Sequence, residues 1–283
     1  MENTKLKILI FKILPKGFIS RIFGYTSLIP LPLGVMKRII AWYSVKYGVI
    51  LAEAEIPAAG YKNLNTFFTR ALKPGSRKID DDKKSVVATT DSRVDQYGDI
   101  TDDSILQAKG VDYSLRELIP SIEAEKFING KYITLYLSPG DYHRIHSPVS
   151  GKIAGFFNIP GKLYTVQEFM VKGFKGLFAV NERLITYIET ENGAVAVCKI
   201  GAINVGKISL SYDHSVTNRF FRSKNEHIYA EDKMPVIKKG DEIGIFNLGS
   251  TVIILFEKGM MEFSDLKDGQ KVKVGEVIGR LSR

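Results

Sequence analysis

Two patterns of hydrophobic residues divide the chain. In residues 5–23 and 34–51, apolar side chains recur at spacings of three and four among basic ones. This pattern predicts two amphipathic helices separated by a loop at Pro30 and Pro32. The segment LNTFFTRAL at 64–72 predicts a third helix. Beyond Lys84 the pattern changes to short β-branched and aromatic runs between glycine-containing turns, which are typical of strands.

The second pattern predicts a mainly β body, whose strongest runs are YITLYL, RLITYIE, AVAVCKI and TVIILFE. Two other segments resemble each other, KKGDEIGIF at 238–246 and KVGEVIGRL at 273–281. In each, a Gly-acid pair precedes an Ile-Gly step, which suits a tight turn between two strands. We therefore predict an α+β fold, in which a sandwich- or barrel-like β body at 85–283 follows an N-terminal helical region at 1–84.

Positive charge is concentrated at the N-terminus. The chain carries a formal net charge of +9, and residues 1–50 hold eight basic residues and one acidic residue. Such a segment favours an acidic partner, either nucleic acid or anionic lipid. Lipid fits better, because the basic residues alternate with apolar ones, among them Ile8, Ile10, Phe11, Leu14, Phe18 and Ile22.

No apolar run of this region reaches the roughly 18 residues of a membrane span, and no signal-peptide cleavage site follows it. We predict an interfacial, membrane-associating helix in the region 1–84 and no nucleic-acid partner. The alternative is an amphipathic helix that packs on the protein's own core. The single cysteine, Cys198, lies in an apolar run and is interpreted as a core residue.

The candidate chemistry begins with two histidines. His143 and His146 lie in SPGDYHRIHSPVSG, where prolines and glycines predict an irregular loop. Histidine on a loop suits acid or base work near neutral pH. A metal site is an alternative, but no nearby histidine, cysteine or paired carboxylate completes a zinc set, and we expect no metal.

Two further segments complete the candidate set. FNLGSTVIILFEKG places Gly249 and Ser250 directly before a strongly apolar strand, which by itself is an ordinary turn. TTDSRVDQYGD holds Asp91 near the start of the β body, where it could be a solvated turn carboxylate. Taken singly, none of these segments defines a function.

Together the segments resemble the phosphatidylserine decarboxylase family over nearly the whole chain. The resemblance rests on LNTFFTRALKPGSRKI (64–79), ILQAKGVDYSL (105–115), YLSPGDYHRIHSPVSG (136–151), LFAVNERL (177–184), IGAINVG (200–206) and LGST (248–251). The histidine segment and LGST form a specific pair. One departure is Ser92, where many members have glycine after the aspartate.

The resemblance implies a proenzyme that cleaves itself between Gly249 and Ser250, giving a β subunit of residues 1–249 and an α subunit of residues 250–283. Ser250 would become a covalent pyruvoyl cofactor, the electron sink for converting phosphatidylserine to phosphatidylethanolamine. The family pattern makes Asp91 the residue that orients His146, His146 the base that activates Ser250, and His143 the acid of the decarboxylation.

Other interpretations stay open at this point. A Ser-His-Asp hydrolase acting on lipid or ester substrates would use Asp91, His146 and Ser250 in the same chain order, although the G-x-S-x-G elbow is missing. A carrier-like or membrane-binding β module would be non-enzymatic. For the enzyme we expect an anionic membrane surface as partner and a peripheral position on the cytoplasmic face of a bacterial inner membrane. A homo-oligomer is left open.

Overall fold

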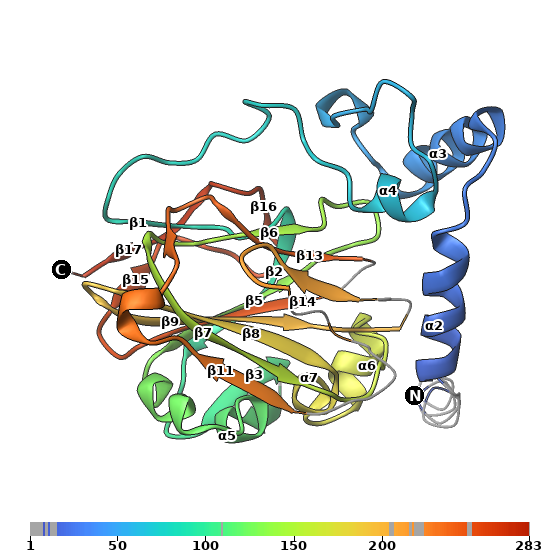
Figure 1. Ribbon diagram of the computed structural model, residues 1–283. Coiled ribbons are helices and arrows are strands. Elements are labelled where there is room, and N and C mark those ends of the chain that lie inside the picture. Colours follow the sequence, from blue (N-terminus) through green and yellow to red (C-terminus); the bar gives the residue numbers. More distant parts are fainter. Residues whose placement is uncertain are drawn as a thin grey trace.

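The computed structural model describes residues 8, 11, 16–108, 110–203, 207–214, 217, 224–247 and 251–282. Helices of the N-terminal part lie together at one side of a body of strands (Figure 1). They are α2 (Lys16–Ser27), α3 (Leu33–Tyr47) and α4 (Leu64–Phe68). Short helical segments also occur at η1 (Leu51–Glu53), α5 (Leu115–Leu118), η2 (Ile122–Phe127), α6 (Glu168–Gly173), α7 (Leu177–Val180) and η3 (Glu231–Lys233). The predicted α+β fold with N-terminal helices is confirmed.

One nine-stranded antiparallel sheet forms the centre of the body. Its order is β11 (Asn225–Ile228), β7 (Gly151–Ile159), β8 (Arg183–Thr190), β9 (Gly193–Ile200), β14 (Thr251–Phe256), β5 (Lys131–Tyr136), β2 (Ser92–Asp99) and β16 (Lys271–Val272), with β12 (Val236–Ile237) also paired to β7. All six residues of β14 are buried, because β5 and β9 flank the strand and both of its faces are covered. This explains the continuous apolar run in the sequence.

Smaller sheets complete the body. One has the order β10 (Ile208–Leu210), β13 (Glu242–Phe246), β6 (Arg144–His146), and another has the order β1 (Ser85–Val87), β17 (Val277–Leu281), β15 (Met261–Phe263). β3 (Ser104–Ala108) and β4 (Val111–Ser114) form a hairpin. β13 packs over β9, since a Cβ added at Gly244 would lie 3.1 Å from Cε of Lys199. The layers are those of the predicted sandwich-like body.

The second and third predicted helices end earlier than the sequence pattern predicts, whereas α2 continues to Ser27, beyond the predicted end at residue 23. Residues 34–51 were expected to be helical, but α3 ends at Tyr47 because Gly48 adopts a left-handed conformation with φ of 72°. α4 begins with a capping box formed by Asn63 and Thr66 and ends at Phe68, so that residues 69–72 of the predicted third helix are extended or irregular. The Pro30–Pro32 loop is present as predicted.

The first predicted helix, 5–23, is described mainly from Lys16 onward, and Ile10 and Leu14 lie outside the described residues. Ile8 and Phe11 pack against the body, where the Phe11 ring lies 5.7 Å from the Phe169 ring of α6. For these two residues the structure has the packing that the own-core alternative describes. Phe18 and Ile22, in contrast, are 63% and 47% exposed.

Candidate active site

His143 lies in the irregular segment 137–143 between β5 and β6, as the sequence predicts, whereas His146 is the last residue of β6. His143 is completely buried, and its Nδ1 lies 2.7 Å from the carbonyl oxygen of Asp141. Because a carbonyl oxygen only accepts, Nδ1 carries a hydrogen and the lone pair of a neutral ring is at Nε2. Within the described structure this Nε2 is buried without a hydrogen-bond partner. Burial, with a smaller contribution from Arg70, lowers the pKa of His143 to about 3.

His146 is held by polar groups on both sides of its ring. Its Nδ1 lies 2.7 Å from the Gly240 carbonyl oxygen, and its Nε2 lies 3.2 Å from the Tyr142 hydroxyl. In the neutral ring, Nδ1 therefore donates to Gly240 and Nε2 accepts from Tyr142. Burial is the main reason that the pKa of His146 is lowered. A neutral His146 has the free base form that activating a hydroxyl requires.

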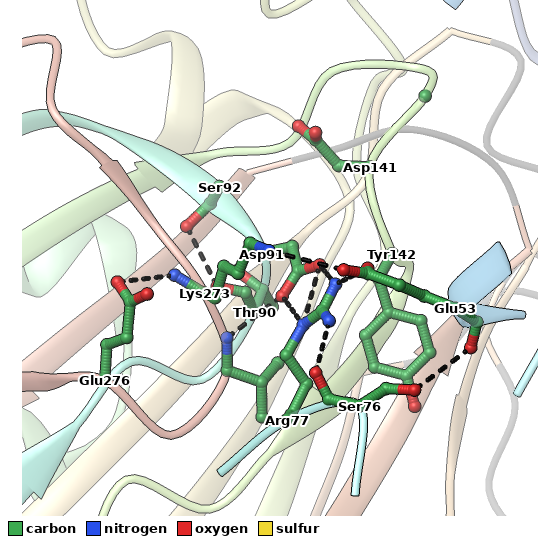
Figure 2. Close-up of polar contacts among 12 residues, drawn as sticks. Glu53, Ser76, Arg77, Thr90, Asp91, Ser92, Asp141, Tyr142, Lys273 and Glu276 are labelled. Carbon is green, nitrogen blue, oxygen red and sulfur yellow. Dashed lines mark hydrogen bonds and ion pairs between the residues drawn. The ribbon is translucent and has the colours of Figure 1, made fainter. Parts of the chain in front are cut away.

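Asp91 directly precedes β2 and is bound to groups other than His146. Its carboxylate accepts hydrogen bonds from the Arg77 guanidinium and from the backbone N–H of Val274, the latter at 3.0 Å. Arg77 also forms an ion pair of 2.7 Å with Glu53 (Figure 2). The structure shows no hydrogen bond between Asp91 and His146, although Asp91 is close enough to raise the pKa of His146 electrostatically.

The two similar segments found in the sequence position both residues. Each forms a tight turn, at 238–241 and at 273–276, with a glycine of φ 88° as its third residue. The N–H of Gly240 donates to Ser147 and that of Gly275 donates to Ala88, at 2.9 and 3.1 Å. The first turn thus presents a carbonyl to His146, and the second presents an N–H to Asp91.

The backbone also joins the two parts of the site. The His146 N–H donates to the carbonyl oxygen of Thr89 at 2.8 Å, two residues before Asp91. Both glycines of the tight turns contact Ile79, which belongs to the extended segment between α4 and β1. That segment crosses over the body in Figure 1. Asp91 and His146 therefore lie in one neighbourhood that the N-terminal region helps to enclose.

Gly249 and Ser250 lie outside the described residues, and so does Leu248. The residues on both sides are described. The N–H of Phe246, the last residue of β13, donates to the carbonyl oxygen of His143 at 2.9 Å. Thr251, the first residue of β14, pairs with Tyr136 and Ile200. The expected cleavage point thus lies between β13 and β14, and the last residue of β13 is hydrogen-bonded to His143.

Arg77 and Tyr142 were not singled out from the sequence, although both lie in segments that carry the family resemblance. Their types gave no separate signal, because an arginine in a charged stretch and a tyrosine beside a histidine are both common. In the part of the chain that the structure describes, no group of three potential metal ligands occurs. His143 and His146 form hydrogen bonds to different carbonyl groups, those of Asp141 and Gly240.

A second feature is an exposed apolar surface on the N-terminal helices. On α2 and α3 the large apolar side chains that are exposed are Phe18, Ile22, Phe23, Tyr25, Leu33, Val35, Trp42, Val45 and Tyr47. Val45 is 88% exposed and Trp42 57%. Lys46 lies over the Trp42 ring, with its Nζ 4.7 Å from the ring centroid. None of the described helices is both long enough and apolar enough to span a bilayer.

Comparisons with known proteins define the class of the chain. Residues 64–280 match the family model of phosphatidylserine decarboxylase. The chain is 41% identical over 280 residues to a phosphatidylserine decarboxylase proenzyme of Myxococcus xanthus, with 98% of both chains covered. It is 39% identical to one of Anaeromyxobacter sp. (98% and 99% covered) and 37% identical to one of Brevibacillus brevis (94% of each).

These relatives are decarboxylases made as proenzymes, so the class is a lyase of phospholipid metabolism. The chain belongs to the phosphatidylserine decarboxylase family. The resemblance seen in the sequence motifs is confirmed, and the comparisons give no support to the hydrolase alternative.

Proposed function

We propose that this enzyme converts phosphatidylserine to phosphatidylethanolamine with a pyruvoyl group that it makes from Ser250 by cleaving its own Gly249–Ser250 bond. The observation that carries the proposal is the bond between the Phe246 N–H and the His143 carbonyl oxygen, at 2.9 Å. This hydrogen bond links the strand that leads to the cleavage point to the segment 143–146, which carries both histidines. The family of the chain supplies the reaction class.

Self-cleavage begins with the Ser250 hydroxyl. Its oxygen attacks the Gly249 carbonyl carbon, and the proton passes to Nε2 of His146, which holds the lone pair in the neutral ring. The Tyr142 hydroxyl lies 3.2 Å from that nitrogen, so it must either move away from Nε2 or pass the proton from Ser250 to it. As the C–N bond between Gly249 and Ser250 breaks, the Ser250 nitrogen takes up a proton and an ester remains. The ester then loses the Cα hydrogen of residue 250 and the Gly249 carboxylate by β-elimination, and hydrolysis of the dehydroalanine releases ammonia and leaves the pyruvoyl group.

Asp91 supports this step through charge and architecture. The Gly240 carbonyl already occupies Nδ1 of His146, the position that an aspartate holds in a hydrolase triad. In our proposal the negative charge of Asp91 favours the protonated form of His146, which exists once the serine has given up its proton. A Ser-His-Asp hydrolase would need a direct hydrogen bond between Asp91 and His146, and its serine would remain unmodified.

The surroundings of His143 fit a pyruvoyl group. Once formed from Ser250, such a group would supply the electron sink for loss of carbon dioxide. His143 offers a buried Nε2 with a lone pair and no partner among the described residues. As proton donor it must first gain a proton there, and the substrate ammonium is a source. His143 would then return that proton to the carbon that lost carbon dioxide.

We further propose that residues 1–84 form the membrane-associating region and residues 85–283 the catalytic body. The exposed apolar side chains of α2 and α3 support peripheral docking, together with Lys37, Arg38 and Lys46 on α3. The basic residues suit an anionic leaflet. Since the relatives named above are bacterial, we place the enzyme on the cytoplasmic face of the inner membrane.

Intact mass spectrometry of the purified chain tests the proposal. We expect two fragments, 1–249 and 250–283, the smaller of which gains mass with borohydride because its N-terminus is a ketone. Ser250→Ala should give one uncut chain without decarboxylase activity. A wild-type chain that stays uncut, or cleavage in the Ser250→Ala variant, would contradict the mechanism.

A further inference from the structure

The loop that carries His143 is fastened to the N-terminal helical region. The Tyr43 hydroxyl on α3 donates to the carbonyl oxygen of Pro139 at 2.8 Å. Arg70, just beyond α4, donates through Nη2 to the carbonyl oxygens of Gly140 and Asp141, at 2.8 and 3.2 Å. Three consecutive carbonyl groups of the loop are thus held by two side chains from outside the β body.

The contact continues on both sides of these hydrogen bonds. Gly140 packs directly on the Tyr47 carbonyl, at the end of α3, so that a Cβ there would collide with backbone. The Phe68 ring lies 4.0 Å from the His143 ring, and Arg144 Nε donates to the carbonyl oxygen of Thr69 at 3.0 Å. His143 is therefore packed between its own loop and α4.

The helix that holds the loop also displays exposed apolar side chains. Met36, Ile40 and Tyr43 recur at helical spacing on the inner side of α3, where Met36 and Ile40 are buried. Val35, Trp42 and Val45 lie on the exposed side. If α3 shifts, its inner and exposed sides move together, because a helix of four turns is a rigid element.

We propose that Tyr43 and Arg70 are positioning residues that fix the orientation of His143, and that they pass the docking of α3 on a lipid surface to the active-site loop. Part of this inference rests on the proposed function, since it assigns His143 a role in decarboxylation. Three hydrogen bonds reach the consecutive residues 139–141 of the loop, and all of them come from side chains of the N-terminal helical region. The position of the loop therefore depends on α3 and α4 as well as on the β body.

The first test uses a matched pair of variants. Tyr43→Phe removes only the hydroxyl that bonds Pro139. Tyr61→Phe removes a similar hydroxyl, which donates to the Glu55 carbonyl oxygen at 3.0 Å within the helical region and has no hydrogen bond to the loop among the described residues. For Tyr43→Phe we expect complete self-cleavage, unchanged sedimentation with vesicles, and a kcat about five-fold lower with KM within two-fold, as loss of one hydrogen bond suggests.

Tyr61→Phe should keep the wild-type kcat. Arg70→Met should lower kcat further than Tyr43→Phe, and Arg70→Lys should recover part of that loss, since an ammonium can still bond a carbonyl oxygen. If Tyr43→Phe and Tyr61→Phe have the same kcat, or if Tyr43→Phe acts only through vesicle binding, the proposal is wrong.

A second measurement does not depend on activity. In the uncut Ser250→Ala background, hydrogen exchange of the peptide 138–146 should be faster with Tyr43→Phe than with Tyr61→Phe. Phosphatidylglycerol vesicles should slow this exchange in the Ser250→Ala chain and in its Tyr61→Phe variant, but less in the Tyr43→Phe variant. Equal exchange in all three chains would overturn the positioning role even if decarboxylation is confirmed. Failure of wild-type cleavage would overturn only the proposed function.

Discussion

Arg77 holds Asp91 through two of its guanidinium nitrogens, and this ion pair joins the N-terminal region to the β body. The Arg77 and Asp91 side chains are only 10% and 13% exposed. The same guanidinium reaches Glu53, and the Val274 N–H completes the surroundings of Asp91. The carboxylate that the family pattern links to His146 therefore depends on three distant segments of the chain.

Arg77→Gln should destabilise the protein, because it leaves two carboxylates near each other without their shared cation. We expect the free energy of unfolding to fall by about 2–3 kcal/mol, the range of a charged, largely buried hydrogen bond. Urea unfolding of the uncut Ser250→Ala chain measures it. Arg116→Gln is the control, since the Arg116 side chain is 50% exposed in its pair with Glu125 and should change stability by less than about 1 kcal/mol. Equal losses of unfolding free energy for the two substitutions would show that the buried ion pair stabilises the protein no more than the exposed one.

The two histidines should separate by role. His146→Ala and Asp91→Asn should accumulate uncut proenzyme, since one removes the base and the other removes the charge that stabilises its protonated form. His143→Ala should still cleave but decarboxylate about 100-fold more slowly, the usual effect of losing a general acid or base. Intact mass and a carbon dioxide release assay distinguish the outcomes. A His143→Ala variant that remains uncut while His146→Ala is cut would reverse the assignment.

Lys199 should make stability depend on pH. Its side chain is fully buried between β9 and β13, its Nζ donates to the Thr186 hydroxyl, and burial lowers its pKa to about 7. Between pH 7 and about 10 the unfolded chain then binds a proton that the folded chain lacks. The free energy of unfolding should therefore rise with pH in that window, by at most about 1.4 kcal/mol per pH unit. Below pH 7 both states are protonated, and the folded protein carries the full penalty of a buried charge.

Lys199→Met should remove this slope and increase stability most at pH 6–7, while the Tyr212 hydroxyl remains 2.7 Å from Thr186 as its partner. Urea unfolding at several pH values in the Ser250→Ala background measures the effect. Lys258→Met, at an exposed position, should keep the original slope. An unchanged slope in the Lys199→Met variant would mean that another group is responsible.

The sequence predicted the elements better than their contacts. The apolar runs marked β5, β8, β9 and β14 within a residue or two, because a strand buried on both faces needs apolar residues at nearly every position. The repeated Gly-acid segments correctly indicated two tight turns. Helix ends were less accurate, since the stop at Gly48 depends on one left-handed residue inside an otherwise helical pattern.

The candidate site was predictable as a set of residues, but its bonds were not. No local pattern tells that the Gly240 carbonyl occupies Nδ1 of His146, or that Arg77 binds Asp91, because these partners are 94 and 14 residues apart. A tertiary arrangement decides between several donors and acceptors of similar chemistry. The assignment of Asp91, His143, His146 and Ser250 to individual steps stays a prediction for the experiments above.

Docking of the enzyme on lipid should depend on the exposed part of the N-terminal helices. Because Ile8 and Phe11 pack on the body, deletion of residues 1–24 would remove internal contacts as well as the surface. Paired substitutions are therefore sharper. Phe18→Ser with Ile22→Ser, or Trp42→Ser with Val45→Ser, should reduce sedimentation with phosphatidylserine vesicles, since each buried apolar side chain contributes up to about 1.5–3 kcal/mol and less at an interface.

The matched control is Ile122→Ser with Val236→Ser. These substitutions change two apolar side chains on the β body that are 80% and 77% exposed. This pair should bind vesicles like the wild type. Raising the salt concentration should weaken binding without abolishing it, because salt screens the attraction of the basic residues over about 8–10 Å and leaves the apolar contribution. All three variants should still cleave themselves, since the groups proposed for cleavage lie in the β body. If the control pair lost as much binding as the helix variants, docking would occur on a different face of the molecule.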